Sequence, residues 1–160
     1  MRKNPARLQQ LQQLAILDTA AERVYDDLTR LLQESLAVPI SMVNLLDAER
    51  DWFKSCVGFP AAESTAETSF CEVFFSTATD LVVVEDTTLD PRFSLHPLVA
   101  GPPHIRFYAA ARLTVNGQTV GTLCAYDVQP HQVTQAQLAD LQALANSAMQ
   151  LMAARGTSAE

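Results

Sequence analysis

The sequence predicts an α+β domain in which one antiparallel sheet is covered by helices from both ends of the chain. Apolar residues recur at helical spacing near both termini, and short apolar runs of strand length fill the middle. The dipeptide Asn116-Gly117 lies between two of these runs. Spacings of three and four residues indicate amphipathic helices. An Asn-Gly pair between two strands favours a tight hairpin turn, which makes the strands antiparallel.

The composition indicates one ordinary soluble domain. The chain has 160 residues, with 11 Lys and Arg against 18 Asp and Glu, giving a net charge of −7. So few cations disfavour nucleic acid as a partner. The N-terminus is too polar for a secretion signal, and no window holds the roughly 18 apolar residues of a membrane span, which favours a cytoplasmic location. The three cysteines lack metal-ligand spacing, so neither a disulfide framework nor a metal site is expected.

Two amphipathic helices are predicted at the N-terminal end. The first covers residues 8–18, where Leu8, Leu11 and Leu14 are spaced by three. The second begins at Thr19–Glu22, a pattern typical of a capping box, and ends before Pro39. Its buried stripe is expected at Val24, Leu28, Leu31, Leu32 and Leu36.

A strand hairpin, a short helix and a further strand are predicted in the middle of the chain. Ile40–Asp47 is apolar on both faces, which is typical of a central strand, and Trp52–Val57 is its antiparallel partner. Ser69–Glu72 has the pattern of a second capping box and opens a short helix that ends near residue 78. Leu81–Val84 is a short buried strand.

A long loop, a second hairpin and a last helix complete the predicted order. Residues 85–103 contain four prolines and one glycine and cannot form a long regular element. Ile105–Leu113 and Thr119–Tyr126 are the strands that flank Asn116-Gly117, and Thr134–Gln137 caps a helix of roughly 20 residues. Its stripe is Leu138, Leu141, Ala145, Ala148 and Met152. This stripe either meets a second subunit or packs wholly on its own sheet.

Strand alternation divides the first strand of the second hairpin into two faces. Arg106, Tyr108, Ala110 and Arg112 share one face, and Ile105, Phe107, Ala109 and Ala111 share the other. If the second set packs under the helices, the first set faces the opposite side of the sheet.

Seven segments in chain order carry a family resemblance. They are Leu17-Asp18-Thr19, Val38-Pro39-Ile40, Trp52-Phe53-Lys54-Ser55, Ser69-Phe70-Cys71, Asp90-Pro91-Arg92-Phe93, Ile105-Arg106-Phe107-Tyr108-Ala109 and Gly121-Thr122-Leu123-Cys124-Ala125-Tyr126-Asp127. Over about residues 14–152 the chain resembles the bacterial GAF domains found at the head of sensor histidine kinases and diguanylate cyclases. It departs from their pattern at Ala110 and Arg112, where Gly and Pro are expected.

The resemblance implies a sheet of about six strands with the terminal helices on one face. A short helix and the long loop would cover a ligand pocket on the other face. The implied organisation is an N-terminal helix at residues 1–18, a GAF domain at 19–154 and a flexible tail at 155–160. The implied function is non-catalytic sensing: a homodimer paired through its terminal helices binds a small molecule and relays its state to an output such as a histidine kinase or diguanylate cyclase.

The residues expected to bind the ligand combine aromatic walls with polar groups, the usual mixture in a small-molecule pocket. They are Trp52, Phe70, Cys71, Asp86, Phe93, His104, Arg106 and Tyr108. The sequence leaves the ligand and any cofactor open. Two alternatives also stay open: a dimerisation scaffold with a filled pocket, and a free methionine sulfoxide reductase that uses Cys71 and Cys124 as attacking and resolving thiols.

Overall fold

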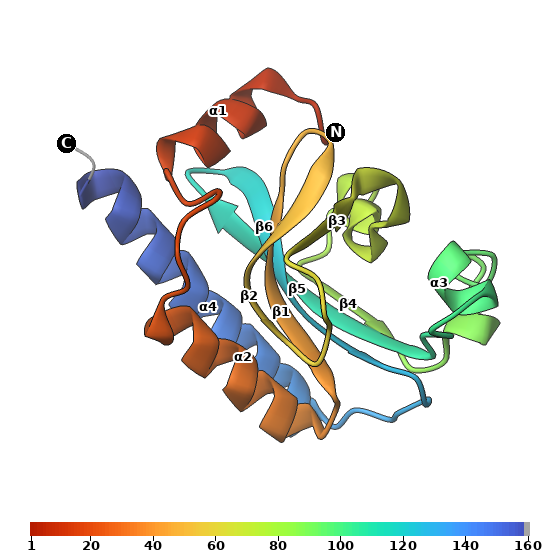
Figure 1. The fold of residues 1–160 in the computed structure, drawn as a ribbon. Helices are drawn as coiled ribbons and strands as arrows, with labels where there is room; N and C mark the ends of the chain where they lie inside the picture. Colours follow the sequence, from red (N-terminus) through yellow and green to blue (C-terminus); the bar gives the residue numbers. More distant parts are fainter. Residues whose placement is uncertain (159–160) are drawn as a thin grey trace.

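The computed structural model describes residues 1–158, with side chains as far as Arg155, and contains one six-stranded antiparallel sheet (Figure 1). The strand order is β3-β2-β1-β6-β5-β4. The strands are β1 (Ile40–Leu46), β2 (Arg50–Val57), β3 (Glu63–Thr65), β4 (Leu81–Val84), β5 (Phe107–Val115) and β6 (Gln118–Asp127). The α-helices are α1 (Pro5–Gln13), α2 (Arg23–Leu36), α3 (Pro97–Ala100) and α4 (Gln135–Ser158), and the 3₁₀ helices are η1 (Ala66–Thr68), η2 (Phe70–Phe75) and η3 (Thr87–Leu89).

The sheet separates two cores. Helices α2 and α4 lie side by side on one face, and η2 and α3 lie on the other side of the sheet in Figure 1. The helix-side core includes Leu32, Val43, Phe107 and Leu141. The pocket-side core includes Met42, Phe53, Phe70, Tyr108 and Tyr126. The predicted fold class, an antiparallel α+β sheet with terminal helices on one face, is confirmed.

Both predicted hairpins are present. Strand β1 is buried along its whole length and pairs with β2, as its two apolar faces predict. Strands β5 and β6 join at Asn116 and Gly117, which have φ angles of 50° and 78°. Such positive values at both central positions are the geometry for which Asn-Gly is preferred. Alternation along β5 is confirmed from Phe107 onward, since Phe107 lies in the helix-side core and Tyr108 in the pocket-side core. Ile105 precedes the strand and joins the pocket-side core instead.

The entry to α2 differs from the predicted capping box. The Thr19 hydroxyl donates to the carbonyl oxygen of Ile16. Glu22 is the N-cap residue, and within the described chain its side chain makes no capping bond. The Glu22 carboxylate instead lies 2.6 Å from Nζ of Lys54, a side chain with no exposed area. A buried ammonium group without a counter-charge costs more free energy than a solvated helix end without a cap. Glu22 therefore pairs with Lys54 and does not cap α2.

The buried face of α2 is rotated from the predicted stripe. Val24 and Leu31 are 48% and 43% exposed, whereas Tyr25 is 1% exposed. Tyr25 and Leu28 begin the buried stripe, which continues at Leu32 and Leu36. Tyr25 takes the buried position because burying its large ring removes more apolar surface from water than burying Val24 would.

The last helix begins as predicted and runs further. Thr134 and Gln137 form a reciprocal capping box: the Gln137 side chain accepts from the Thr134 N–H at 2.9 Å, and Thr134 Oγ1 accepts from the Gln137 N–H at 3.1 Å. Four stripe residues are fully buried in the domain's own core, namely Leu141, Ala145, Ala148 and Met152. Helix α4 extends to Ser158 and so overlaps the segment 155–160 expected to be a tail, of which residues 159–160 lie outside those described.

Candidate functional site

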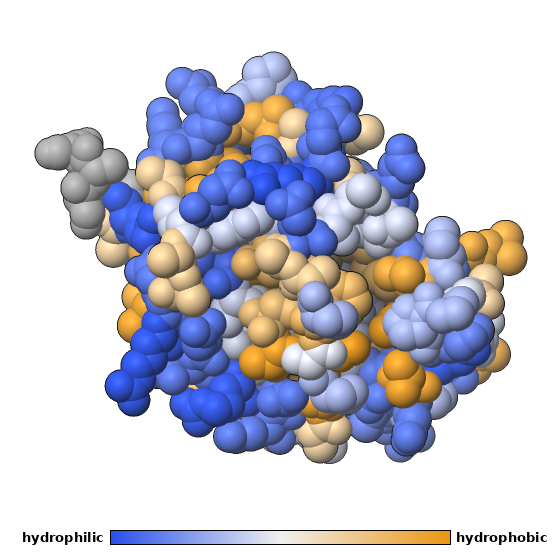
Figure 2. All heavy atoms as spheres, in the orientation of Figure 1, coloured by the Kyte–Doolittle hydropathy of each residue, from blue (hydrophilic) through white to orange (hydrophobic). Residues whose placement is uncertain are grey.

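The pocket-side core leaves a partly open cavity of about 50 Å³ between β1, β2, η2 and the α3 segment. Its walls are mostly apolar and include Met42, Phe53 and Phe70. Its polar floor contains Asn44 and Asp51. Figure 2 shows apolar surface near the centre of the view, where β2 and β3 run in Figure 1, with hydrophilic side chains around it. A space of this size holds a few water molecules or one end of a small molecule.

An aromatic cluster around Phe70 fills much of the space beneath the long loop. The ring of Phe70 lies 5.3 Å from the ring centres of both Phe93 and Tyr108, 5.4 Å from that of Tyr126 and 4.2 Å from that of His96. Aromatic pairs at these separations stabilise one another beyond their buried area. The cluster therefore displaces the open space toward β1 and β2.

Four predicted site residues surround or contribute to this cluster, and one lies on the wrong face. Phe70 lines the cavity, while Phe93, Tyr108 and Cys71 lie behind it in the pocket-side core. Trp52 belongs to the helix-side core and is opposite Leu45 of β1, so its expected place in the pocket is corrected. Successive side chains of a strand point to opposite faces, and Phe53 occupies the cavity wall instead.

The structure does not bring Asp86, His104 and Arg106 to the cavity; all three belong to the long loop and its junction with β5. Asp86 caps η3 by accepting from the N–H of Thr88 at 3.0 Å and from its hydroxyl at 2.6 Å, and these bonds lower the pKa of Asp86. His104 is exposed, with a φ of 61°. Arg106 Nη1 donates to the carbonyl oxygen of Val99 at 2.9 Å. The bonds of Asp86 and Arg106 fix the loop that covers the pocket-side core.

The polar floor is formed by two residues that the sequence analysis did not select. Asn44 of β1 is 1% exposed and Asp51 of β2 is 2% exposed. Asn44 Nδ2 donates to Oδ2 of Asp51 at 3.0 Å. The available signal is one amide in an otherwise apolar central strand; Asp51 directly precedes the predicted strand Trp52–Val57 and carries no such signal.

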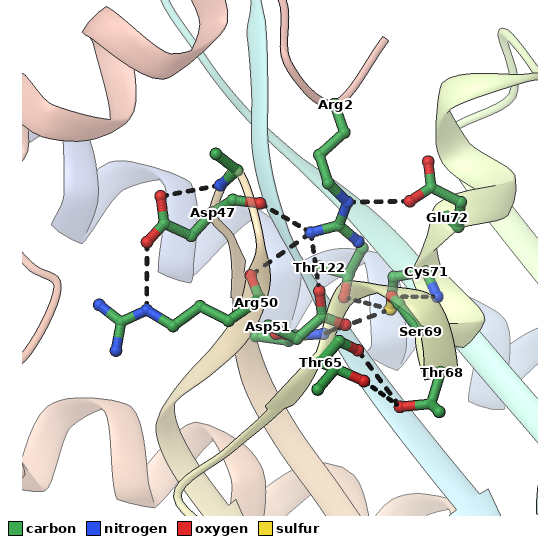
Figure 3. A network of polar contacts seen from close by, with 12 residues as sticks. Arg2, Asp47, Arg50, Asp51, Thr65, Thr68, Ser69, Cys71, Glu72 and Thr122 are labelled. Atoms are coloured by element: carbon green, nitrogen blue, oxygen red, sulfur yellow. Dashed lines mark hydrogen bonds and ion pairs between the residues drawn. The ribbon is translucent and has the colours of Figure 1, made fainter.

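Arg2 binds the floor from the N-terminal side, as Figure 3 shows. Its Nη1 lies 2.9 Å from Oδ1 of Asp51 and donates to the carbonyl oxygen of Asp47 at 2.8 Å. Its Nε donates to Oε1 of Glu72 at 2.8 Å, so Glu72 pairs with Arg2 and does not complete the predicted capping box of η2. Ser69 does cap η2, accepting from the N–H of Cys71 at 3.1 Å.

Burial governs the electrostatics of Asp51. Loss of water raises its pKa, and this effect exceeds the opposing hydrogen bonds from Ser69 and Asn44 and the attraction of Arg2. A buried carboxylate needs such partners to stay charged. Arg2 supplies the compensating charge, so the floor presents polar atoms to the cavity with little net charge.

Cys71 is surrounded by hydrogen-bonding groups but is sealed from solvent. Its Sγ lies 3.1 Å from the Tyr108 hydroxyl oxygen, 3.0 Å from that of Thr122 and 3.6 Å from Asn44 Nδ2. Burial by itself raises the pKa of the Cys71 thiol, but hydrogen bonds from Cys124, Thr122 and Tyr108 outweigh it and lower the pKa. The side chain is 0% exposed.

Fold and cavity together define the class of single-sheet α+β domains that carry terminal helices on one face and a pocket on the other. A model of the GAF domain family matches residues 20–152, and the chain belongs to that family. A bilayer-spanning segment would need a longer apolar helix than any found within residues 1–158.

Three similar proteins place the family membership in context. A cyclic di-GMP phosphodiesterase from Pseudomonas aeruginosa is 35% identical over 119 residues, which cover 74% of this chain and 20% of the phosphodiesterase. The chain thus spans about one fifth of that relative. The GAF domain of an Acinetobacter phosphoenolpyruvate-protein phosphotransferase has a TM-score of 0.67 at 13% identity, covering 98% of both chains. The free methionine-R-sulfoxide reductase of Neisseria meningitidis, solved with its substrate, has a TM-score of 0.66 at 16% identity, covering 94% of this chain and 89% of that one. The two solved structures share the fold with this chain.

Proposed function

We propose that this chain is a non-catalytic cytoplasmic sensory domain that binds a small molecule in the cavity between β1, β2 and η2. The observation that carries the proposal is the cavity itself, a space bordered by aromatic walls with two buried polar side chains, Asn44 and Asp51, at its floor. Apolar walls with a few placed polar groups are typical of ligand pockets.

Strand β1 provides the route from the cavity to the helices. Met42 and Asn44 line the cavity, whereas the alternate residues Val43 and Leu45 lie in the helix-side core. Helix α2 packs on β1 and against α4. A ligand that favours one position of β1 therefore also favours one arrangement of α2 and α4, and a coupling of roughly 1 to 3 kcal/mol is enough for regulation.

The output lies with another domain or protein. The similarity to a cyclic di-GMP phosphodiesterase supports an output in cyclic di-GMP signalling, and a diguanylate cyclase or histidine kinase is the output implied by the family resemblance. We infer that the domain pairs with a second copy through its terminal helices. The exposed apolar side chains of Val24 and Leu31 on α2 support this pairing surface.

A ligand screen with a blocked cavity tests the sensory function. Nucleotides, amino acids, purine metabolites and small aromatic compounds are added to the protein, and the Tm is measured. We expect at least one compound to raise the Tm of the parent and not that of Met42→Trp, whose indole fills the cavity. Leu89→Trp, at a side chain that is 82% exposed, is the matched control. If no compound raises the Tm of a protein that still dimerises, the scaffold alternative holds.

Thiol chemistry at Cys71 is a second candidate, favoured by the hydrogen-bonding groups that surround its sulfur. Reduction of a sulfoxide would require η2 to open, because the sulfur is fully buried. The test is turnover of free methionine sulfoxide with a thiol reductant, by the parent and by Cys71→Ser. Turnover that Cys71→Ser abolishes supports the enzyme, and an inactive parent eliminates it.

A further inference from the structure

The amide of Asn44 is held in one orientation with its oxygen unpartnered. Its Nδ2 donates to Oδ2 of Asp51 at 3.0 Å and lies 3.6 Å from Sγ of Cys71. Because both neighbours take N–H donors, the nitrogen must face them and Oδ1 must face away. Among the residues described, this buried oxygen has no hydrogen-bond partner. A buried acceptor without a hydrogen-bond partner destabilises the protein. A bound molecule that donates a hydrogen bond to this oxygen would recover the lost free energy.

The Asp51 carboxylate at the floor already has a counter-charge. Asp51 is paired with Arg2 at 2.9 Å, and Arg2 is also paired with Glu72 at 2.8 Å. A cationic ligand would have to compete with Arg2, and an anionic ligand would meet the Asp51 carboxylate. Either charge would also lose its hydration against the apolar walls. The site therefore disfavours a charged ligand.

The walls add a preference for a flat ring. Phe53, Phe70 and Tyr126 border the cavity, and aromatic faces and edges pack favourably on another ring. We infer, resting on the proposed function, that the cavity selects a neutral aromatic molecule whose N–H or O–H group donates to Oδ1 of Asn44. Such a ligand satisfies the unpartnered acceptor without disturbing the pair of Arg2 and Asp51.

Two compounds of nearly the same shape test this inference on the parent protein. Phenol carries an O–H donor and is neutral at pH 7, and fluorobenzene has the same ring without the donor. Binding is followed by NMR shifts of the backbone amides of β1 and η2. We expect phenol to bind about tenfold more tightly, the effect of one hydrogen bond to an otherwise unpaired buried acceptor. Benzoate should not bind, and it should leave the backbone amide signals of β1 and η2 unshifted.

The outcomes separate this inference from the function on which it rests. Equal affinity for phenol and fluorobenzene overturns the donor requirement and leaves ligand sensing intact. Tighter binding of benzoate or benzylamine than of phenol overturns the neutral preference. Failure of every aromatic compound overturns the inference, while the broader metabolite screen decides the sensory function independently.

Two variants locate the recognition at the named atoms. Asn44→Leu keeps a similar volume and removes the acceptor, so phenol should fall to the affinity of fluorobenzene. Asn146→Leu on the exposed side of α4 is its control and should leave the preference unchanged. Arg2→Met removes the counter-charge of Asp51. The ratio of the affinity for benzylamine to the affinity for phenol should then be at least about tenfold higher than in the parent. The comparison in the parent decides the inference if either variant fails to fold.

Discussion

Nη1 of Arg2 lies 2.9 Å from Oδ1 of Asp51, and their side chains are only 7% and 3% exposed. This contact joins the second residue of the chain to a strand at the centre of the pocket floor. The N-terminal segment is therefore packed into the domain. The Arg2 guanidinium compensates the negative charge of Asp51 at the floor of the cavity.

Replacing Arg2 should destabilise the domain strongly. In Arg2→Met the Asp51 carboxylate stays buried without its counter-charge, and breaking a buried pair in this way costs about 3 kcal/mol. The free energy of unfolding from urea denaturation measures it. Lys3 is the control, because its pair with Glu49 is 67% and 77% exposed, and Lys3→Met should cost less than about 1 kcal/mol. Equal losses for the two variants would contradict the structural role of Arg2.

Arg112 fastens the end of η2 to β5. Its guanidinium donates to the carbonyl oxygens of Phe74, Thr77 and Thr79 at 3.0, 2.7 and 2.8 Å, and lies 5.1 Å from the centre of the Phe74 ring. The family resemblance predicts proline at this position, and the Arg112 guanidinium binds backbone carbonyl groups and does not line the cavity.

Lysine cannot replace this arginine. A single ammonium lacks the planar fork that reaches several carbonyls at once, so Arg112→Lys should lose about 2 kcal/mol and speed amide exchange at residues 74–80. Arg30→Lys, at a side chain 55% exposed, should change neither. Unchanged exchange in Arg112→Lys would show that the carbonyl contacts are dispensable.

The fold could be predicted because its signals are local. The Asn116-Gly117 turn, the doubly apolar strand β1 and the Thr134 capping box each depend on a few neighbouring residues. The α2 errors arose where a distant partner decides the outcome. Lys54 draws Glu22 away from the helix cap, and the size of Tyr25 decides which face is buried.

The site was harder to predict because strand parity and tertiary pairing determine it. Trp52 and Phe53 are equally apolar neighbours, and only the pairing with β1 decides which one faces the cavity. Asp51 could not be selected because nothing nearby in sequence shows that Arg2 is folded against it. Asn44 was visible as an amide in an apolar strand, but its role depends on the oxygen left unpartnered among the described residues.

Gly121 sets the distance between β6 and the cavity strand β1. A Cβ at this position would lie 2.2 Å from the carbonyl oxygen of Asn44. Gly121→Ala must push the strands apart, which should cost about 2 kcal/mol or more and weaken phenol binding by moving Asn44. Gly117→Ala is the contrast: its Cβ meets no described atom within 4 Å, so only the strain of its φ of 78° applies and phenol affinity should stay the same. Loss of phenol binding in both variants would count against the clash.

His96 should make the segment that covers the cavity sensitive to pH. Its Nδ1 accepts from the N–H of Leu98 at 3.0 Å, so Nε2 carries the proton and donates to the carbonyl oxygen of Thr68 at 3.2 Å. Thr68 and Leu98 both line the cavity. Burial lowers the pKa of His96 from its usual value of 6.5, against the smaller effect of the bond to Thr68.

The sign of the pH dependence follows from that depression. Well above pH 6.5 the ring is neutral in both the folded and the unfolded state, and its contribution to stability is fully present. As the pH falls below 6.5 the unfolded chain takes up the proton first, so stability is lost until the folded ring is protonated as well. A protonated Nδ1 can no longer accept from Leu98, so amide exchange at Leu98 should quicken and phenol binding should weaken as the pH falls below 6.5.

Glutamine isolates the effect of the imidazole. In His96→Gln the amide oxygen can accept from the N–H of Leu98 and the amide nitrogen can donate to Thr68, without titrating. The difference in Tm between parent and His96→Gln, measured from pH 7 to 5, cancels the carboxylates common to both proteins. We expect the Tm of the parent to fall relative to the Tm of His96→Gln as the pH is lowered. His104→Gln, at an exposed position, should follow the parent throughout. If the three proteins lose Tm in parallel, the pH dependence belongs to other groups and His96 is a pH-independent tether of the loop.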